Sequence, residues 1–272
     1  MNTKKDFTKA IGSLSLDKGD ILEYLENSYN EIHGFLWDEA TLCTVLLSQI
    51  QRKLSIGGDV AEIGLWYGKY FFLLSLLCRE GEKATGVDSF VHAADPVEHE
   101  RQFRQFLQDS VSGNKHVSVL KEDSQTLTPR DLDPDNEKKI RIFSVDGDHT
   151  CAGALHDLKL AAETICQGGV IILDDYYNPT CPGVTEAYFR FDVMYREYNL
   201  RPFAYIANKL FITHDSHAQQ YYDLFFTELK NNEDIPFGQQ ALDFHENHNN
   251  LGIPIQLSGA DILIVLLNTW PQ

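Results

Sequence analysis

The chain has 272 residues, 43% of them hydrophobic, which suits one large α/β domain with a few added elements. Its formal net charge of −17 disfavours DNA or RNA as a partner, since no local basic patch offsets the repulsion. The sequence contains no apolar run long enough to predict a membrane span, and the N-terminus lacks the apolar core of a secretory signal. The five cysteines form no C-x-x-C pair, which favours reduced thiols in a cytoplasmic protein.

Apolar runs and helical stretches alternate through the middle of the chain, which predicts a doubly wound, mostly parallel α/β sheet. The runs lack polar alternation, as expected of strands covered on both faces. Strands are predicted over residues 59–64, 83–88, 116–120, 140–146 and 169–175. Helices are predicted over 69–81, 96–111 and 150–165, the last of them ended by Gly168 and Gly169.

The second half of the sequence predicts a further helix over 183–199 and two short strands within 202–214 that are joined at 207–209. Another helix follows over 217–232, then an irregular stretch over 233–256. In this stretch "HENHNN" reads as a solvated loop, although its two histidines invite a metal-site interpretation. The apolar run near the end fits either a strand or a helix.

Three regions follow from these elements. Residues 1–54 are predicted to form an N-terminal helical extension, residues 55–215 a seven-stranded Rossmann-like core, and residues 216–272 a C-terminal helix and extension packed on that core. The role of the C-terminal extension and the oligomeric state stay open, and a homo-oligomer is compatible with the sequence.

A glycine loop follows the first predicted strand. Gly64 and Gly68 are spaced G-x-x-x-G, and Trp66 stands where a dinucleotide site needs a glycine to admit the pyrophosphate. Glu62, within the strand, favours a cationic group, and Asp88, at the end of the second strand, is placed to accept both hydroxyls of a ribose. A ligand with a ribose, an ammonium group and no phosphate is S-adenosylmethionine. The alternative is that the glycines only permit a tight turn.

The loop and its downstream acid resemble motif I of class I methyltransferases. In such enzymes a polar residue after the third strand often contacts the adenine, which implies this role for Asp123 and Ser124. The cofactor-binding residues expected from the loop and from the resemblance are Glu62, Gly64, Gly68, Asp88, Ser89, Asp123, Ser124 and Asp146.

Carboxylates follow the fourth and fifth strands. Asp146 ends one strand, and Asp174 and Asp175 end the other. Because these strands are neighbours in a doubly wound sheet, the three side chains are expected to converge at its carboxyl edge. A hard divalent ion would relieve their repulsion, and carboxylate oxygens suit Mg²⁺, Mn²⁺ or Ca²⁺ better than zinc. The alternative is an ordinary boundary between strand and loop.

The stretch 145–187 resembles a bacterial family that includes metal-dependent sugar O-methyltransferases of macrolide and aminocoumarin biosynthesis and cephalosporin-hydroxylase-like proteins. The resemblance covers about residues 59–212. It implies that Asp146, Asp174 and Asp175 hold a divalent ion, with magnesium expected, and that His149 lies beside the substrate hydroxyl. His149 is then the candidate general base, with Asp148 as the alternative.

The function predicted from the sequence is S-adenosylmethionine-dependent O-methyl transfer, assisted by a divalent metal, to a hydroxyl of a small molecule or sugar. Alternatives are a metal-free N-methyltransferase, a nicotinamide-dependent oxidoreductase and a binding module that has lost turnover. Among the weaker candidates, His149 has a structural interpretation, Tyr176 and Tyr177 could line the acceptor pocket, and Lys209 is expected to be solvated.

Overall fold

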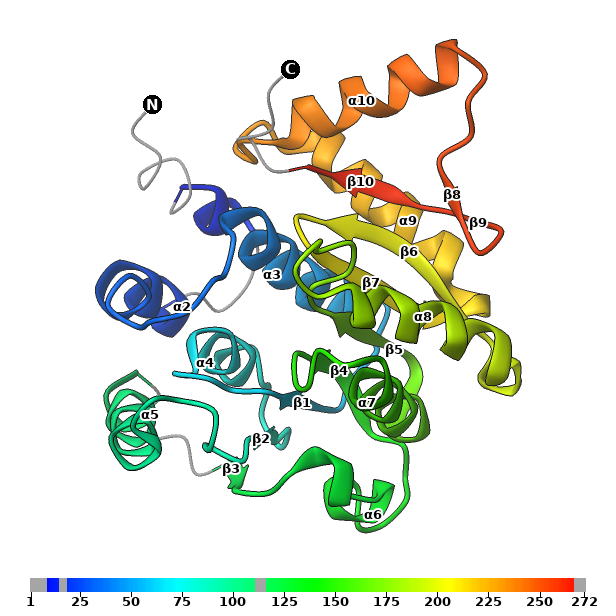
Figure 1. Cartoon of the computed structure of the whole chain (residues 1–272). Helices are drawn as coiled ribbons and strands as arrows, with labels where there is room; N and C mark the ends of the chain where they lie inside the picture. The colour runs from blue at the N-terminus through cyan, green and yellow to red at the C-terminus, as the bar shows by residue number, and fades with distance from the viewer. Residues whose placement is uncertain (1–8, 15–18, 111–115, 267–272) are drawn as a thin grey trace.

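The computed structural model describes residues 9–14, 19–110 and 116–266. Helices cover both faces of one eight-stranded sheet of order β10-β6-β7-β5-β4-β1-β2-β3 (Figure 1). Only β7 runs antiparallel to its neighbours. The strands of this sheet are β1 (Asp59–Ile63), β2 (Ala84–Val87), β3 (Val117–Leu120), β4 (Ile140–Val145), β5 (Ile165–Leu173), β6 (Leu200–Ile206), β7 (Lys209–His214) and β10 (Leu263–Val265).

The helices divide between the two faces because the strands alternate their side chains between two buried clusters. The helices are α2 (Gly19–Glu23), α3 (Asp38–Lys53), α4 (Lys69–Leu76), α5 (Pro96–Ser110), α6 (Pro129–Leu132), α7 (Cys151–Thr164), α8 (Pro182–Met194), α9 (Asp215–Asn231) and α10 (Gly238–Asn250). In β1, Val60 packs into the cluster beneath α3, α4 and α9, whereas Ala61 packs into the cluster beneath α7 and α8. A π-helical turn (Tyr24–Ser28) and two 3₁₀ turns (Ser124–Thr126 and Arg196–Tyr198) complete the helical elements, and β8 (Gln256–Leu257) pairs with β9 (Ala260–Asp261).

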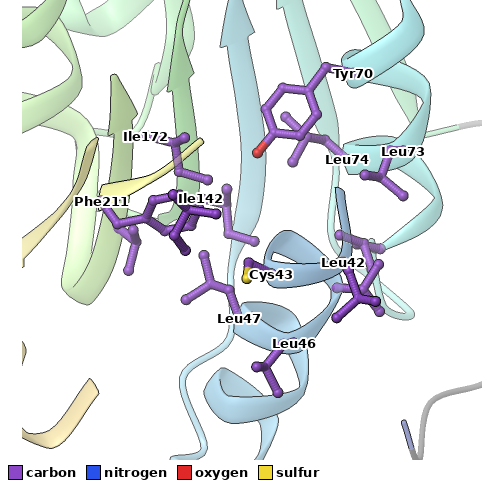
Figure 2. Packing of buried hydrophobic residues seen from close by; sticks show 14 of the residues in the cluster. Leu42, Cys43, Leu46, Leu47, Tyr70, Leu73, Leu74, Ile142, Ile172 and Phe211 are labelled. Atoms are coloured by element: carbon purple, nitrogen blue, oxygen red, sulfur yellow. The ribbon is translucent and has the colours of Figure 1, made fainter. Parts of the chain in front are cut away.

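Helix α3 forms the centre of the larger cluster. Its Leu47 lies beneath the sheet on the side of Ile142 of β4 (Figure 2), and Leu46 and Phe211 of β7 belong to the same buried cluster. Burial of each such side chain contributes about 1.5–3 kcal/mol to folding. The N-terminal segment is thereby fastened to the layer that carries the glycine loop. None of the helices within the described residues is both long and apolar enough to cross a bilayer.

The boundary between α7 and β5 differs from the prediction. The helix ends at Thr164 and the strand begins at Ile165, so Gly168 and Gly169 lie inside β5 rather than after a helix. The pairing with β4 shifts register across this stretch, and Gly168 has a φ of +77°. The glycines therefore form a bulge within the strand.

The stretch 233–256 was wrongly predicted to be irregular, because it contains α10. His245, expected in a solvated loop, is buried on this helix, and its Nε2 accepts a hydrogen bond of 2.9 Å from the backbone N–H of Ile264. Burial lowers the pKa of His245, which keeps the ring neutral and able to accept. The apolar run near the end forms β10, while residues 267–272 lie outside the described residues.

Candidate active site

The carboxyl ends of β1, β4 and β5 meet where the strand order reverses, between β1 and β4. Asp146 continues β4, and its N–H donates to the carbonyl of Ile63, 2.9 Å away. Asp174 continues β5 in the same way, donating to the carbonyl of Val145 at 3.0 Å. The two aspartates are thus held side by side at the edge where open α/β sheets bind ligands.

The glycine loop lies against this edge, and its backbone requires glycine. Gly64 has a φ of +85°, and a Cβ there would lie 1.7 Å from the carbonyl oxygen of Asp146. Gly68 has a φ of +92°, and its Cβ would lie 2.3 Å from the ring of Phe72. The loop therefore owes its close approach to β4 and to the following helix to these two residues.

Asp88 fastens the loop from the end of β2. Its Oδ2 accepts hydrogen bonds from the N–H groups of Leu65 at 2.8 Å and Trp66 at 3.0 Å. Its Oδ1 accepts from the N–H of Phe90 at 2.7 Å. Since a carboxylate offers roughly four acceptor sites, about one remains for a ligand. This count leaves about one acceptor site for a ribose hydroxyl, and contact with both hydroxyls stays a prediction.

Glu62 is buried two residues before Gly64, with only 1% of its surface exposed. Its Oε1 accepts from the hydroxyl of Ser144 at 3.0 Å, while its Oε2 has no hydrogen-bond partner among the described residues. Burial, followed by the charge of Asp146, raises the pKa of Glu62 well above its usual value. A cationic ligand group would satisfy this oxygen, so the residue fits a sulfonium nucleoside with an ammonium group.

The residues predicted at the adenine end are arranged around a short 3₁₀ turn. Asp123 is exposed and caps this turn, with its Oδ1 accepting from the N–H of Gln125 at 3.0 Å. Ser124 is buried, and Ser89, next to Asp88, is half-buried. Their roles toward the cofactor stay predictions.

Lys209 was predicted to be solvated, and this is wrong. The hairpin between β6 and β7 places its ammonium 2.7 Å from Asp174 Oδ2, with 1% of the residue exposed. The ammonium also lies 4.6 Å from the centre of the Tyr70 ring. Burial raises the pKa of Asp174, but the Lys209 charge and the hydrogen bonds outweigh it, so the pKa lies below the usual value.

The other oxygen of Asp174 is occupied as well. Oδ1 accepts from Asn208 Nδ2 at 2.7 Å and from the N–H of Asp175 at 2.9 Å. Asp174 is therefore already neutralised and hydrogen-bonded within the protein. Among the described residues, neither Asp146 nor Asp175 pairs with a lysine. Because Asp174 is already neutralised, the three aspartates do not fit a magnesium ion as arranged.

His149 bridges the two loops that follow β4 and β5. Its Nε2 lies 3.3 Å from Asp175 Oδ2 and 3.6 Å from Asp146 Oδ1, and its Nδ1 lies 3.2 Å from Cys181 Sγ. The hydrogen bond with Asp146 raises the pKa of His149. Burial and the nearby Asp174 raise the pKa of Asp146 to about 8.

Asp148, the alternative base, binds Thr150, the residue that precedes α7. It is exposed, and its two oxygens accept from the N–H of Thr150 at 3.0 Å and from the Thr150 hydroxyl at 2.7 Å. Sequence reasoning also missed Cys181, Asn208 and Lys209 as members of the site. Their only signal in the sequence is a place in the loop after β5 or in the turn before β7.

Comparison with known proteins finds a related domain and a shared fold. Residues 61–176 match the model of a family described as a methyltransferase domain. A search of curated proteins found no significant match. CalS11, a TDP-rhamnose 3′-O-methyltransferase of calicheamicin biosynthesis whose apo structure is known, is 17% identical, with a TM-score of 0.52 over 78% of this chain and 92% of its own.

Two further solved structures share the fold. The O-methyltransferase NovP is 15% identical, with a TM-score of 0.55 over 67% of this chain and 82% of its own. A putative O-methyltransferase from Klebsiella pneumoniae is also 15% identical, with a TM-score of 0.50 over 78% and 98%. The predicted fold and enzyme class are confirmed. Residues 61–176 thus match a methyltransferase domain, and the described chain has the fold of the class I S-adenosylmethionine-dependent methyltransferases.

Proposed function

We propose that the protein transfers a methyl group from S-adenosylmethionine to a hydroxyl of a small molecule or sugar. The observation that carries this proposal is the cluster of Asp146, His149 and Asp175, which lies at the same sheet edge as the glycine loop. CalS11 and NovP, which share this fold, are O-methyltransferases, which supports the same acceptor class.

The residues around the loop divide the recognition of the methyl donor. Gly64 and Gly68 let the backbone approach, and the free Oε2 of Glu62 suits the ammonium group. Asp88 keeps about one acceptor site for a ribose hydroxyl. The 3₁₀ turn that Asp123 caps borders the adenine end in this proposal. The sheet edge then directs the sulfonium methyl toward the carboxylate cluster.

Methyl transfer needs an in-line nucleophile, and alignment supplies much of the barrier reduction. A lone pair of the acceptor oxygen forms the new C–O bond, the S–C bond breaks, and adenosylhomocysteine leaves. The hydroxyl proton passes to the pair formed by Asp146 Oδ1 and His149 Nε2, which lie 3.6 Å apart. A divalent ion, when bound beside this pair, would lower the pKa of the acceptor hydroxyl.

Calorimetry with adenosylhomocysteine and with NAD⁺ tests the cofactor part. We expect adenosylhomocysteine to bind and NAD⁺ not to bind, because Trp66 stands where a dinucleotide loop needs glycine. Binding of NAD⁺ alone would overturn the proposal.

A methyl-transfer assay on a panel of sugars and phenols, with matched amines, tests the acceptor class. His149→Ala and Asp146→Asn should each slow transfer to a hydroxyl by about 10²–10⁴-fold, with little change in adenosylhomocysteine affinity. Asp148→Asn is the matched control, since the Asp148 carboxylate accepts its hydrogen bonds from Thr150 at the helix start, and it should change the rate by less than about threefold. Transfer to amines only would assign the N-methyltransferase alternative.

A further inference from the structure

A sulfur ligand lies next to the carboxylate cluster. Cys181 immediately precedes α8, and its Sγ lies 3.2 Å from Nδ1 of His149. One ligand atom each from Cys181, His149 and Asp175 can be chosen such that all three lie within 4.8 Å of one another. They come from two separate loops, after β4 and after β5, so the fold brings together a thiol, an imidazole and a carboxylate.

These donors differ in kind from the set expected for magnesium. Magnesium prefers octahedral oxygen ligands, and the third carboxylate of that set, Asp174, is taken up by Lys209. Thiolate and imidazole ligands favour zinc and its neighbours in the transition series. Tetrahedral sites with bonds of about 2.0–2.3 Å separate their ligand atoms by roughly 3.3–3.7 Å, close to the observed sulfur–nitrogen distance.

We infer that Cys181 Sγ, His149 Nδ1 and one oxygen of Asp175 form a binding site for a divalent ion of the zinc class. Three protein ligands leave a coordination position open, as in catalytic zinc sites. Nε2 of His149 keeps its place next to Asp146, the arrangement in which an outer carboxylate orients a ligating histidine. On binding, the thiol loses its proton to solvent and binds as the thiolate.

This inference rests on the proposed function, because it identifies the ion that would lie beside the acceptor hydroxyl. With the ion on Nδ1, Nε2 of His149 carries the ring hydrogen and faces Asp146, so in the metal-bound protein the Asp146 carboxylate is the group that accepts the hydroxyl proton. Because Cys181 supplies a sulfur ligand, the site should prefer zinc-class ions, whereas a site made of oxygen ligands alone would prefer magnesium.

Titration of the chelator-treated protein with Co²⁺ tests the site directly, because a cobalt–thiolate bond produces a charge-transfer absorption in the near ultraviolet. We expect this band at one equivalent, and we expect Zn²⁺, but not millimolar Mg²⁺, to displace it. Cys181→Ser should abolish the band and weaken Zn²⁺ binding at least tenfold. Cys166→Ser is the matched control, because Cys166 lies at the start of β5, at the opposite end of the strand, and should leave the band unchanged.

Absence of the band in the native protein, or its persistence in Cys181→Ser, would overturn the inference. Displacement by Mg²⁺ as readily as by Zn²⁺ would overturn it as well. Adenosylhomocysteine binding, measured on the same chelator-treated samples, separates the two proposals. If the nucleoside binds and no thiolate band forms, the metal site is wrong while the cofactor assignment stands; if the band forms without nucleoside binding, the proposed function is wrong.

Discussion

Replacement of Lys209 by methionine gives the sharpest test of the electrostatics at the sheet edge. Lys209 is 1% exposed and Asp174 is 6% exposed, and their charged atoms lie 2.7 Å apart. Removing the ammonium leaves a buried carboxylate without its counter-charge, which costs about 3–5 kcal/mol. The variant Lys209→Met should lose this much free energy of unfolding at pH 7.

The loss should shrink in acid, because protonation of Asp174 removes the unpaired charge. In the native protein the pKa of Asp174 lies below the value in the unfolded chain. The stability from the pair is therefore present above about pH 4 and is lost as the pH falls through the folded pKa. Lys209→Met lacks this contribution, so the two proteins should converge in stability toward low pH.

Urea denaturation followed by circular dichroism measures these differences. The double variant Lys209→Met, Asp174→Asn should recover much of the loss, since it removes both charges. Arg190→Met is the control, because Arg190 pairs with Glu186 where both side chains are more than half exposed, and it should cost less than about 1 kcal/mol. A loss at Lys209 no larger than at Arg190, or no recovery in the double variant, would refute the reasoning.

Two further predictions concern the same edge. Gly64→Ala and Gly81→Ala both place alanine at a φ near +85°, which costs roughly 1–2 kcal/mol in each variant. At Gly64 the new Cβ also meets a carbonyl oxygen, whereas at Gly81 it meets nothing within 4 Å. Gly64→Ala should therefore lose more stability and more adenosylhomocysteine affinity than Gly81→Ala. Equal losses by denaturation and calorimetry would contradict this. The second prediction concerns Asp146, whose pKa is raised to about 8 in the folded protein. Between about pH 4 and pH 8 the folded state therefore holds a proton on this carboxyl that the unfolded state has lost. The metal-free protein should become less stable as the pH rises through this range. The free energy of unfolding should fall by at most about 1.4 kcal/mol per pH unit, and solvent screening reduces this slope. Asp146→Asn should flatten the slope. A native protein whose stability varies with pH no more than that of the variant would exclude the raised pKa of Asp146.

The strands that build the site could be predicted because each is a continuous apolar run of the kind that a covered parallel sheet requires. Once β4 and β5 are recognised, the proximity of Asp146 and Asp174 follows from the fold, because the strands pair in register up to Val145 and Leu173. The glycine loop could likewise be predicted, since the spacing of its glycines implied a tight turn.

The partners of these residues could not be predicted in the same way. Lys209 lies 35 positions beyond Asp174, in a hairpin turn where a lysine ordinarily faces water, and only the pairing of β7 with β5 brings the two together. Cys181 was equally hidden, because a cysteine before a proline carries no signal until the loop around it is folded. Local sequence patterns thus identify the carboxylates, whereas long-range contacts decide which carboxylate is already neutralised by a lysine and which can still bind a ligand.

The irregular stretch after α9 failed for a different reason. The segment that forms α10 is rich in polar residues, and its buried side chains are few and widely spaced, among them Ala241 and His245. A buried histidine contributes nothing to a hydrophobic pattern, so the helical period was concealed.

That same histidine also has a bearing on how the molecule behaves in concentrated solution. An outermost strand normally presents free amide groups that can recruit a strand from another chain. Here the imidazole of His245 occupies the outward amide of Ile264, and the strand that carries it is only three residues long. The edge strand β10 is thus partly capped by His245 of α10, which disfavours pairing with a strand of another molecule and so disfavours aggregation.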